Sequence, residues 1–247
     1  MDSRIQAHAI AEQAVRTARQ GAAWAVHTLT ASGVVLGMLS LLEVFRGDPR
    51  AALLWLGAAL AVDGLDGPIA RRIGVRDILP RVDGAALDLI VDYLTYVLVP
   101  ALFIYWFELL PPAFGLYGAG WIVLTSLYCF ANLDMKTTDN YFVGFPAIWN
   151  VVAFFFFVLA TPPWINLAAT VVLGVLTFVP IKFIHPLRVR EQLPVTLVAT
   201  AAWAVSSFVL VFFYPRAPAW MAWMLIAASC WLAFVSLRRT LRRRPAE

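Results

Sequence analysis

The sequence predicts an all-α polytopic membrane protein with eight transmembrane helices, an N-terminal interfacial amphipathic helix and both termini in the cytoplasm. Composition gives the first reason for this class. Hydrophobic residues make up 62% of the 247 residues and charged residues 14%, whereas an ordinary soluble domain is roughly half apolar and about a quarter charged. The apolar residues also gather in long runs, and one aqueous core could not bury them all. A soluble globular enzyme and a disordered chain are therefore both excluded.

Eight segments reach the roughly 20 mostly apolar residues that a membrane-spanning helix needs. In chain order they cover residues 22–44, 51–73, 84–107, 113–133, 144–161, 163–184, 194–214 and 218–237. The fifth is the shortest of them. Thr161, Pro162 and Pro163 leave little room between the fifth and the sixth, so we expect these two spans to meet in a tight turn.

The residues before the first span differ from the spans in pattern. Residues 3–20 are polar on one side, carry apolar residues such as Ile5 and Val15, and end near Arg16 and Arg19. This arrangement is typical of an amphipathic helix that lies in the membrane interface. We therefore expect an interfacial helix over residues 1–21.

The basic residues indicate the orientation of the spans. If the N-terminus is cytoplasmic, all but three of the 19 Lys and Arg residues fall on the cytoplasmic side, the exceptions being Arg46, Arg50 and Arg216. Cytoplasmic loops of membrane proteins carry such an excess of Lys and Arg. The net charge of +4 is thus a topology signal and does not indicate a nucleic-acid partner. The basic C-terminal tail is expected to contact anionic membrane lipids.

Four aspartates lie within two neighbouring predicted spans. Asp63 and Asp66 are in the second span, and Asp88 and Asp92 are in the third. An Asp at the centre of a spanning helix costs about 2.5–3.5 kcal/mol, so these residues need partners. Asp63 and Asp66 share one helix face, and Gly84, Asp88 and Asp92 share another. A short loop makes the two helices antiparallel neighbours, so the four carboxylates can converge.

Such a cluster predicts bound cations. Carboxylates that face one another in a low-dielectric site repel strongly and recruit positive charge. Oxygen ligands favour Mg²⁺ or Mn²⁺ over zinc, and a pair of such ions suits phosphoryl chemistry. Arg71, one turn beyond the acids, could hold a phosphate. Small residues beside the acids leave space for a ligand: Gly64, Gly67, Ala70 and Gly84.

The acids allow two other interpretations. A single intramembrane Asp can serve only as a hydrogen-bond partner, but four on two facing helices beside small residues are hard to explain in that way. A cation transporter is the alternative from another class. Transporters place their sites near the membrane midplane between structural repeats, whereas these acids lie near one membrane face and the sequence shows no repeat.

The pattern resembles the signature of the CDP-alcohol phosphotransferase family, D-x2-D-G-x2-A-R-x8-G-x3-D-x3-D. The matching positions run from Asp63 to Arg71 and from Gly84 to Asp92. The spacer over residues 72–83 is longer than the pattern has. A longer spacer, eight spans and the overall length are similar to the phosphatidylcholine synthase branch of that family.

The resemblance also implies a domain organisation, because the wider family has a smaller helical core. Residues 1–247 would form a single membrane-embedded domain. Within it, the interfacial helix (1–21) would precede a catalytic core (22–190), followed by two additional spans and a basic tail (191–247). A homodimer in the bacterial inner membrane is implied by the same likeness.

The reaction implied by the resemblance is transfer of the phosphatidyl group of CDP-diacylglycerol to choline, with release of CMP. Two Mn²⁺ or Mg²⁺ ions would assist it from the cytoplasmic face. By this likeness Asp63, Asp66 and Asp88 are metal ligands, and Asp92 is a ligand and the general base. The CDP-lipid would be bound by Gly67, Ala70, Arg71 and Gly84.

Other residues are candidates for the remaining parts of the substrates. Aromatic faces suit the cationic choline head, and six aromatic residues follow Asp92 or begin the fifth span: Tyr93, Tyr96, Tyr141, Phe142, Phe145 and Trp149. Lys182 and Arg188 are candidates for the lipid phosphate. His27 is expected to be a core histidine with satisfied hydrogen bonds. Serine or glycerol 3-phosphate stays open as the acceptor alcohol.

Overall fold

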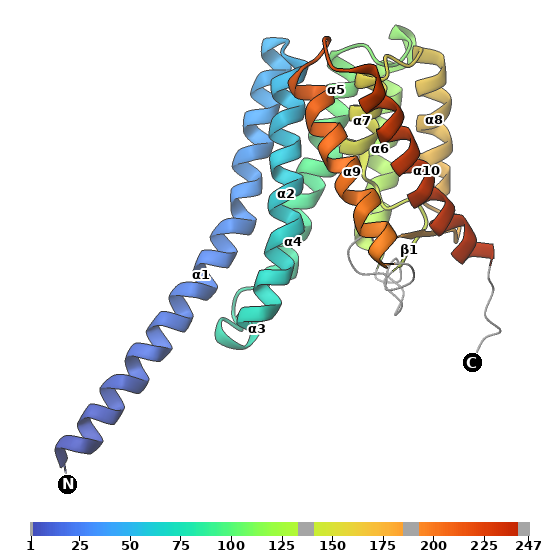
Figure 1. Cartoon of the computed structure of the whole chain (residues 1–247). Coiled ribbons are helices and arrows are strands. Elements are labelled where there is room, and N and C mark those ends of the chain that lie inside the picture. The colour runs from blue at the N-terminus through green and yellow to red at the C-terminus, as the bar shows by residue number, and fades with distance from the viewer. Residues whose placement is uncertain (1, 133–140, 185–192, 242–247) are drawn as a thin grey trace.

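Figure 1 shows the computed structural model of the chain, which describes residues 2–132, 141–184 and 193–241. The first half contains α1 (Asp2–Arg46), α2 (Pro49–Ile73), the short α3 (Val75–Ile78), α4 (Gly84–Asp92), the π-helical η1 (Tyr93–Leu98), α5 (Val99–Trp106), the 3₁₀ turn η2 (Pro112–Phe114) and α6 (Gly115–Ala131). The second half contains β1 (Tyr141–Val143), α7 (Trp149–Val158), α8 (Pro163–Leu176), β2 (Lys182–Ile184), α9 (Leu193–Phe212) and α10 (Ala219–Leu241).

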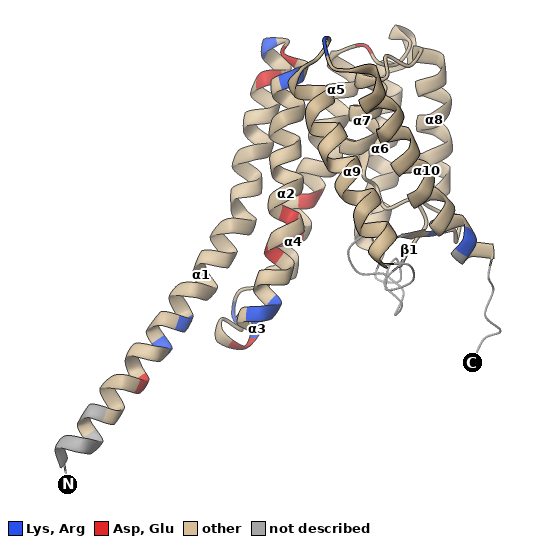
Figure 2. Cartoon of the chain, in the orientation of Figure 1, with Lys and Arg blue, Asp and Glu red and all other residues tan. Residues whose placement is uncertain are grey.

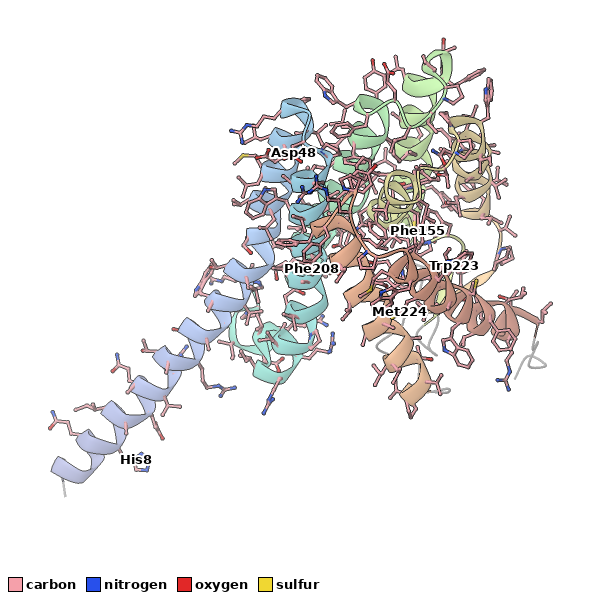
Figure 3. The ribbon with its side chains drawn as sticks, turned by 45° about the horizontal axis from the view of Figure 1, so that its top comes forward. His8, Asp48, Phe155, Phe208, Trp223 and Met224 are labelled. Carbon is pink, nitrogen blue, oxygen red and sulfur yellow. The ribbon has the colours of Figure 1, made fainter. Side chains whose placement is uncertain are left out.

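The described chain is a helical bundle, as predicted for a polytopic membrane protein. Six of its helical segments are long and apolar enough to cross a membrane: His8–Arg46, Pro49–Ile73, Gly84–Trp106, Pro112–Ala131, Leu193–Phe212 and Ala219–Arg238. Outward-facing side chains are largely apolar, and Phe208 on α9 and Trp223 on α10 are 57% and 71% exposed (Figure 3). An apolar outer surface of this kind is suited to lipid and not to water. The chain is therefore an integral membrane protein.

The predicted fifth and sixth spans are shorter as helices than expected. Helix α7 has 10 residues and α8 has 14, so neither extends over the whole predicted range. Gly144 adopts a left-handed conformation with φ 83°, and Pro146 and Pro180 cannot donate the backbone hydrogen bond that a helix needs. The chain beside them instead forms the antiparallel pair β1–β2, with Tyr141 opposite Ile184.

The structure corrects the expectation of a separate interfacial helix over residues 1–21. Residues 2–46 form one continuous helix, α1, whose N-terminal part extends away from the bundle (Figure 1). Gly21 is followed by Ala22 and Ala23, and one helical Gly costs only about 1 kcal/mol relative to Ala. Nothing in this stretch therefore ends the helix. Residues 8–19 are exposed.

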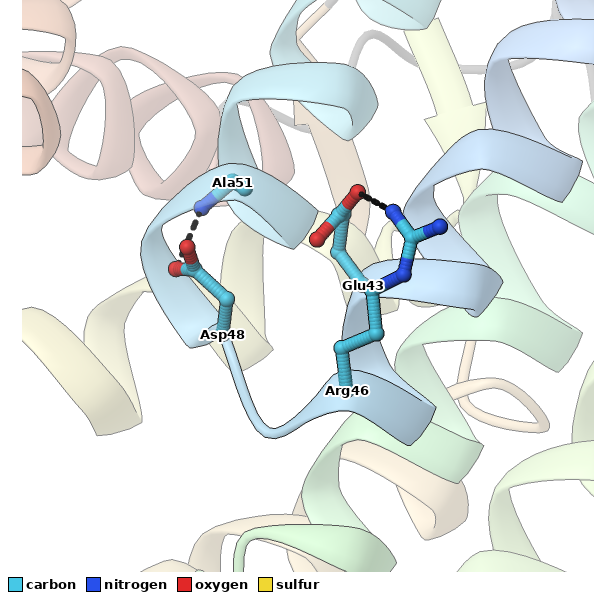
Figure 4. Close-up of polar contacts among 4 residues, drawn as sticks. All are labelled: Glu43, Arg46, Asp48 and Ala51. Carbon is cyan, nitrogen blue, oxygen red and sulfur yellow. Dashed lines mark hydrogen bonds and ion pairs between the residues drawn. The ribbon is translucent and has the colours of Figure 1, made fainter.

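The turn between α1 and α2 is fixed by short polar contacts (Figure 4). The Asp48 carboxylate accepts the backbone N–H of Ala51 at 3.0 Å and caps α2, and the Arg46 guanidinium donates to Glu43 at 2.7 Å. Further along, the Ser40 hydroxyl donates to the Ala52 carbonyl oxygen at 2.9 Å. These contacts hold α1 and α2 together as an antiparallel pair.

Small residues bring α1 close to the third predicted span. A Cβ on Gly33 would lie 2.5 Å from Cγ1 of Val91, and one on Gly37 would lie 3.1 Å from Leu94 and Thr95 side-chain atoms. Such glycines let helix backbones approach within membranes. Helices α1, α2 and α4 with η1 are thereby packed into one group. The main core includes residues of α1, α2 and η1 and the fully buried side chains of Phe103, Ile104, Ile122, Trp149 and Leu225.

The long spacer between α2 and α4 has a structural purpose. Gly74, with φ 74°, ends α2 in the left-handed conformation, and its N–H donates to the Ala70 carbonyl. One helical turn, α3, follows, and its Val75 packs with Ala23 and Val26 of α1. The Asp83 carboxylate then caps α4 through the N–H groups of Ala85 and Ala86. The residues that exceed the family pattern thus fold onto α1.

Candidate active site

Three of the four predicted aspartates meet between α2 and α4. Asp63 comes from α2, and Asp88 and Asp92 come from α4 one turn apart. Each offers a carboxylate oxygen within 4.8 Å of the other two, and all three side chains are partly buried. Figure 2 shows acidic residues within α2 and α4, with basic residues towards the α3 end of α2. The predicted convergence of Asp63, Asp88 and Asp92 is confirmed.

The geometry of the three carboxylates fits a hard divalent cation. Ligand oxygens at about 2.1 Å from an octahedral ion lie roughly 3.0–4.2 Å from one another. The three carboxylate oxygens lie within 4.8 Å of one another, which is close to this range. Three acidic oxygens are also the ligand type that Mg²⁺ and Mn²⁺ select. The aspartate cluster can therefore hold a metal ion.

Asp66 takes a different position. It is 4% exposed, and among the described residues it is not one of the three mutually close carboxylates. Three residues along an α-helix correspond to roughly 300° of rotation, so Asp66 points to one side of Asp63 and lies about one turn nearer the α3 end of α2. Its place as a metal ligand stays a prediction.

Tyr96 reaches the aspartate cluster from η1. Its hydroxyl donates to Oδ2 of Asp63 at 2.6 Å, and its side chain is 9% exposed. The wider turns of η1 bond the Val99 N–H to the Leu94 carbonyl. Pro100 has no N–H for the carbonyl four residues before it, which favours this local widening. Isolated π-helical turns often occur at functional sites.

The residues predicted to bind the CDP-lipid lie on α2 and at the start of α4. Gly67 and Ala70 are partly buried and Arg71 is exposed at the end of α2. Gly84 faces the His27 ring, since a Cβ there would lie 3.0 Å from Cε1 of His27. His27 is 7% exposed, but its Nε2 has no hydrogen-bond partner among the described residues, so the expectation of a fully satisfied histidine is wrong.

The aromatic candidates for choline lie in different parts of the structure. Phe145 and Trp149 are core residues with ring centroids 5.1 Å apart, and the Trp149 indole N–H donates to the Ser126 hydroxyl at 2.9 Å. Tyr93 is partly buried and donates its hydroxyl to the Val123 carbonyl at 3.1 Å. Tyr141 and Phe142 lie on β1. Choline contact by any of the six stays a prediction.

The candidates for the lipid phosphate are only partly described. Lys182 begins β2, and its backbone N–H donates to the Thr240 hydroxyl at 2.9 Å. Arg188 lies outside the described residues. Strand β2 is thereby attached to α10, near the end of the bundle where β1 also lies (Figure 1).

Known proteins resemble this chain over most of its length. A phosphatidylcholine synthase of Pseudomonas aeruginosa is 50% identical over 220 residues, which cover 89% of this chain and 92% of that protein. The chain belongs to the phosphatidylcholine synthase family. Family members from Bradyrhizobium diazoefficiens and Mesorhizobium japonicum are 42% and 46% identical, over 89% and 74% of this chain and 82% and 69% of theirs. No family model matches the chain.

Membership of the phosphatidylcholine synthase family agrees with the branch that the sequence resembles. It also excludes the transporter interpretation of the acids, because relatives named for a synthase cover almost the whole chain. Two features of this site were not predicted from the sequence: the Tyr96–Asp63 hydrogen bond and the packing of His27 on Gly84. Tyr96 does continue the i, i+4 series of Gly84, Asp88 and Asp92, which was an available signal.

Proposed function

We propose that this protein transfers the phosphatidyl group of CDP-diacylglycerol to choline and releases CMP. The observation that carries the proposal is the three-aspartate cluster on α2 and α4 in a chain related to phosphatidylcholine synthases. A lipid donor and a water-soluble acceptor would both have to reach these residues. A site between membrane-spanning helices, close to a polar end of the bundle, suits both.

In the proposed mechanism, Asp92 accepts the proton of the choline hydroxyl while that oxygen attacks the lipid-side phosphorus. The bond from this phosphorus to the CMP oxygen breaks, so atoms and charge balance as phosphatidylcholine and CMP. Asp63, Asp66, Asp88 and Asp92 would hold divalent ions, which when bound offset negative charge on the phosphoryl oxygens. A carboxylate base within reach of the hydroxyl typically contributes about 10²–10⁴ in rate.

The surrounding residues would orient the CDP group. Arg71 is exposed one turn beyond Asp66 and can reach a phosphate with two N–H donors. Gly67 and Ala70 continue the same part of α2 without bulky side chains. Gly84 lies one turn before Asp88 on α4, beside the His27 ring, and would approach the CDP group through its backbone. The negative diphosphate would thus lie between bound cations and a guanidinium.

We propose two Mn²⁺ or Mg²⁺ ions, with Asp66 as a ligand of the second. The aspartate cluster accounts for one ion, and Asp66 is close enough along α2 to add a second site beside it. Wild-type protein is expected to bind two Mn²⁺ per chain and Asp66→Asn only one, measured by equilibrium dialysis. Asp77→Asn, an exposed acid on α3, serves as the control. One Mn²⁺ per wild-type chain would contradict the two-ion proposal.

The choline head would be held by aromatic faces. Tyr93 is the aromatic residue directly after the proposed base, and β1 carries Tyr141 and Phe142. Phe145 and Trp149 pack on one another behind this segment and would act mainly by shaping it. Lys182 and Arg188 would neutralise the phosphate of the lipid substrate.

We further propose that α7 and α8, with their flanking residues, complete eight crossings of a bacterial inner membrane. The start of α1, the end of α10 and α3 lie at the same end of the bundle (Figure 1), which is consistent with cytoplasmic termini and a cytoplasmic site. We also propose that the protein forms the homodimer that the family likeness implies. Cysteine labelling from either side of sealed vesicles tests the orientation.

One assay tests the reaction. Detergent-solubilised protein is incubated with CDP-diacylglycerol, Mn²⁺ and one alcohol at a time, and CMP release is measured. Release with choline alone supports the proposal. Release with serine or glycerol 3-phosphate would assign another acceptor, and no release with any alcohol would reject the transferase.

A further inference from the structure

We propose that Tyr96 is a positioning residue of the metal centre, which holds Asp63 in the orientation that binds the ion. The inference rests on the proposed metal centre and adds a residue outside the sequence signature. The Tyr96 hydroxyl donates to Oδ2 of Asp63 at 2.6 Å. Hydrogen bonds from a hydroxyl to an ionised carboxylate fall at about 2.5–2.7 Å and are roughly twice as strong as neutral ones.

The contact is suited to orient a metal ligand. A phenol has one proton to donate, and Tyr96 directs it to Oδ2 of Asp63, which restricts the rotation of a carboxylate that belongs to the aspartate cluster. Carboxylate ligands of metals are commonly held by such outer hydrogen bonds, whose removal weakens metal binding by about 10–100-fold. Tyr96 is 9% exposed, so water does not readily replace its hydroxyl. The bond also joins α2, which carries Asp63, to η1, which carries Tyr96.

The backbone of η1 directs two tyrosines to different helices. Tyr96 reaches Asp63 on α2, whereas Tyr93 donates to the Val123 carbonyl on α6 and packs edge-on against Phe130 at 5.6 Å. Both lose one buried or partly buried hydroxyl when changed to Phe. Of these two hydroxyls, that of Tyr96 donates to the aspartate cluster and that of Tyr93 donates to α6, so Tyr93→Phe is a matched control for metal binding.

The first test measures Mn²⁺ binding directly by the EPR signal of free Mn²⁺, with full-length protein in detergent. Tyr96→Phe is expected to raise the Mn²⁺ dissociation constant about 10–100-fold, while Tyr93→Phe keeps the wild-type value. In an Asp63→Asn background, Tyr96→Phe should cause no further loss, because its partner ligand is already removed. Wild-type Mn²⁺ affinity in folded Tyr96→Phe would overturn the inference.

A second measurement does not depend on the folding of a variant. 3-Fluorotyrosine placed at position 96 keeps the ring and the hydroxyl, and its ¹⁹F resonance reports the Asp63 contact. Titration with diamagnetic Mg²⁺ is expected to shift this resonance in a saturable manner, whereas the same label at position 93 is unaffected. A resonance at position 96 that does not respond to saturating Mg²⁺ would overturn the inference.

The results separate this inference from the proposed reaction. If Tyr96 governs Mn²⁺ affinity but no alcohol supports CMP release, the positioning role stands and the transferase proposal fails. If CMP is released with choline while both Tyr96 measurements give wild-type behaviour, the transferase stands and the positioning role fails. Wild-type protein that binds no Mn²⁺ overturns both the metal centre and the role of Tyr96.

Discussion

Replacing Asp92 by Asn is expected to lower the turnover number by about 10²–10⁴ without unfolding the protein. The amide cannot accept the hydroxyl proton of choline, and it replaces one of the three clustered carboxylates with a neutral group. Asn has nearly the same volume as Asp, so the packing of α4 against α1 is retained. CMP release measures turnover, and a thermal melt in detergent confirms the fold.

Asp83→Asn is the matched control for Asp92→Asn. Asp83 stands at the start of the same helix and accepts the N–H groups of Ala85 and Ala86 at 3.0 and 3.1 Å. Asn caps helices as well as Asp does, and Asp83 is not part of the aspartate cluster. The control should retain activity. Near-normal turnover in Asp92→Asn would refute the assignment of Asp92 as the base.

The largest loss of stability is expected for Gly144→Ala. Gly144 has φ 83°, and a Cβ there would overlap the carbonyl oxygen of Thr177 at the end of α8. The left-handed conformation costs a non-glycine residue roughly 1–2 kcal/mol. Overpacking typically adds about 1–3 kcal/mol, and a backbone carbonyl yields less than a side chain. The Gly144 N–H also donates to the Ile181 carbonyl at 2.8 Å, so the link between β1 and β2 would be strained.

Two control variants separate the causes of this loss. Gly47 has φ 76° but open space around a Cβ, and Gly57 is helical with equal space. In thermal melts, Gly57→Ala should match or exceed the wild type, Gly47→Ala should unfold at a lower temperature, and Gly144→Ala at the lowest. If Gly144→Ala unfolds at the same temperature as Gly47→Ala, the expected overlap with the Thr177 carbonyl oxygen does not destabilise the protein.

The convergence of the acids was predictable from spacing alone. Asp88 and Asp92 are four residues apart and therefore share a face, and the connection over residues 74–83 lets α4 return beside the α3 end of α2. Asp66 was harder to place, because an i+3 neighbour of Asp63 shares its general side of the helix without sharing its partners. Its burial depends on how α2 rotates within the bundle, which sequence periodicity does not fix.

Other features depended on contacts between distant segments. The i, i+4 series places Tyr96 on the face of Asp88 and Asp92, but its bond to Asp63 depends on how η1 packs beside α2. The continuous α1 could not be distinguished from two helices, because an amphipathic pattern is the same whether a helix lies on a membrane or projects from it. The early ends of α7 and α8 did have a signal in Gly144, Pro146 and Pro180, which the apolar composition of the two segments concealed.

The unbroken helix α1 has a practical consequence for experimental imaging. A 27.4 kDa membrane protein has little mass outside its detergent micelle for particle alignment in cryo-electron microscopy. The solvent-exposed turns over residues 8–19 continue directly into the helix that packs beside Gly84 and Val91. A helical fiducial protein fused in register to these turns would be held rigidly against the catalytic end of the bundle, and its orientation would report that of the bundle.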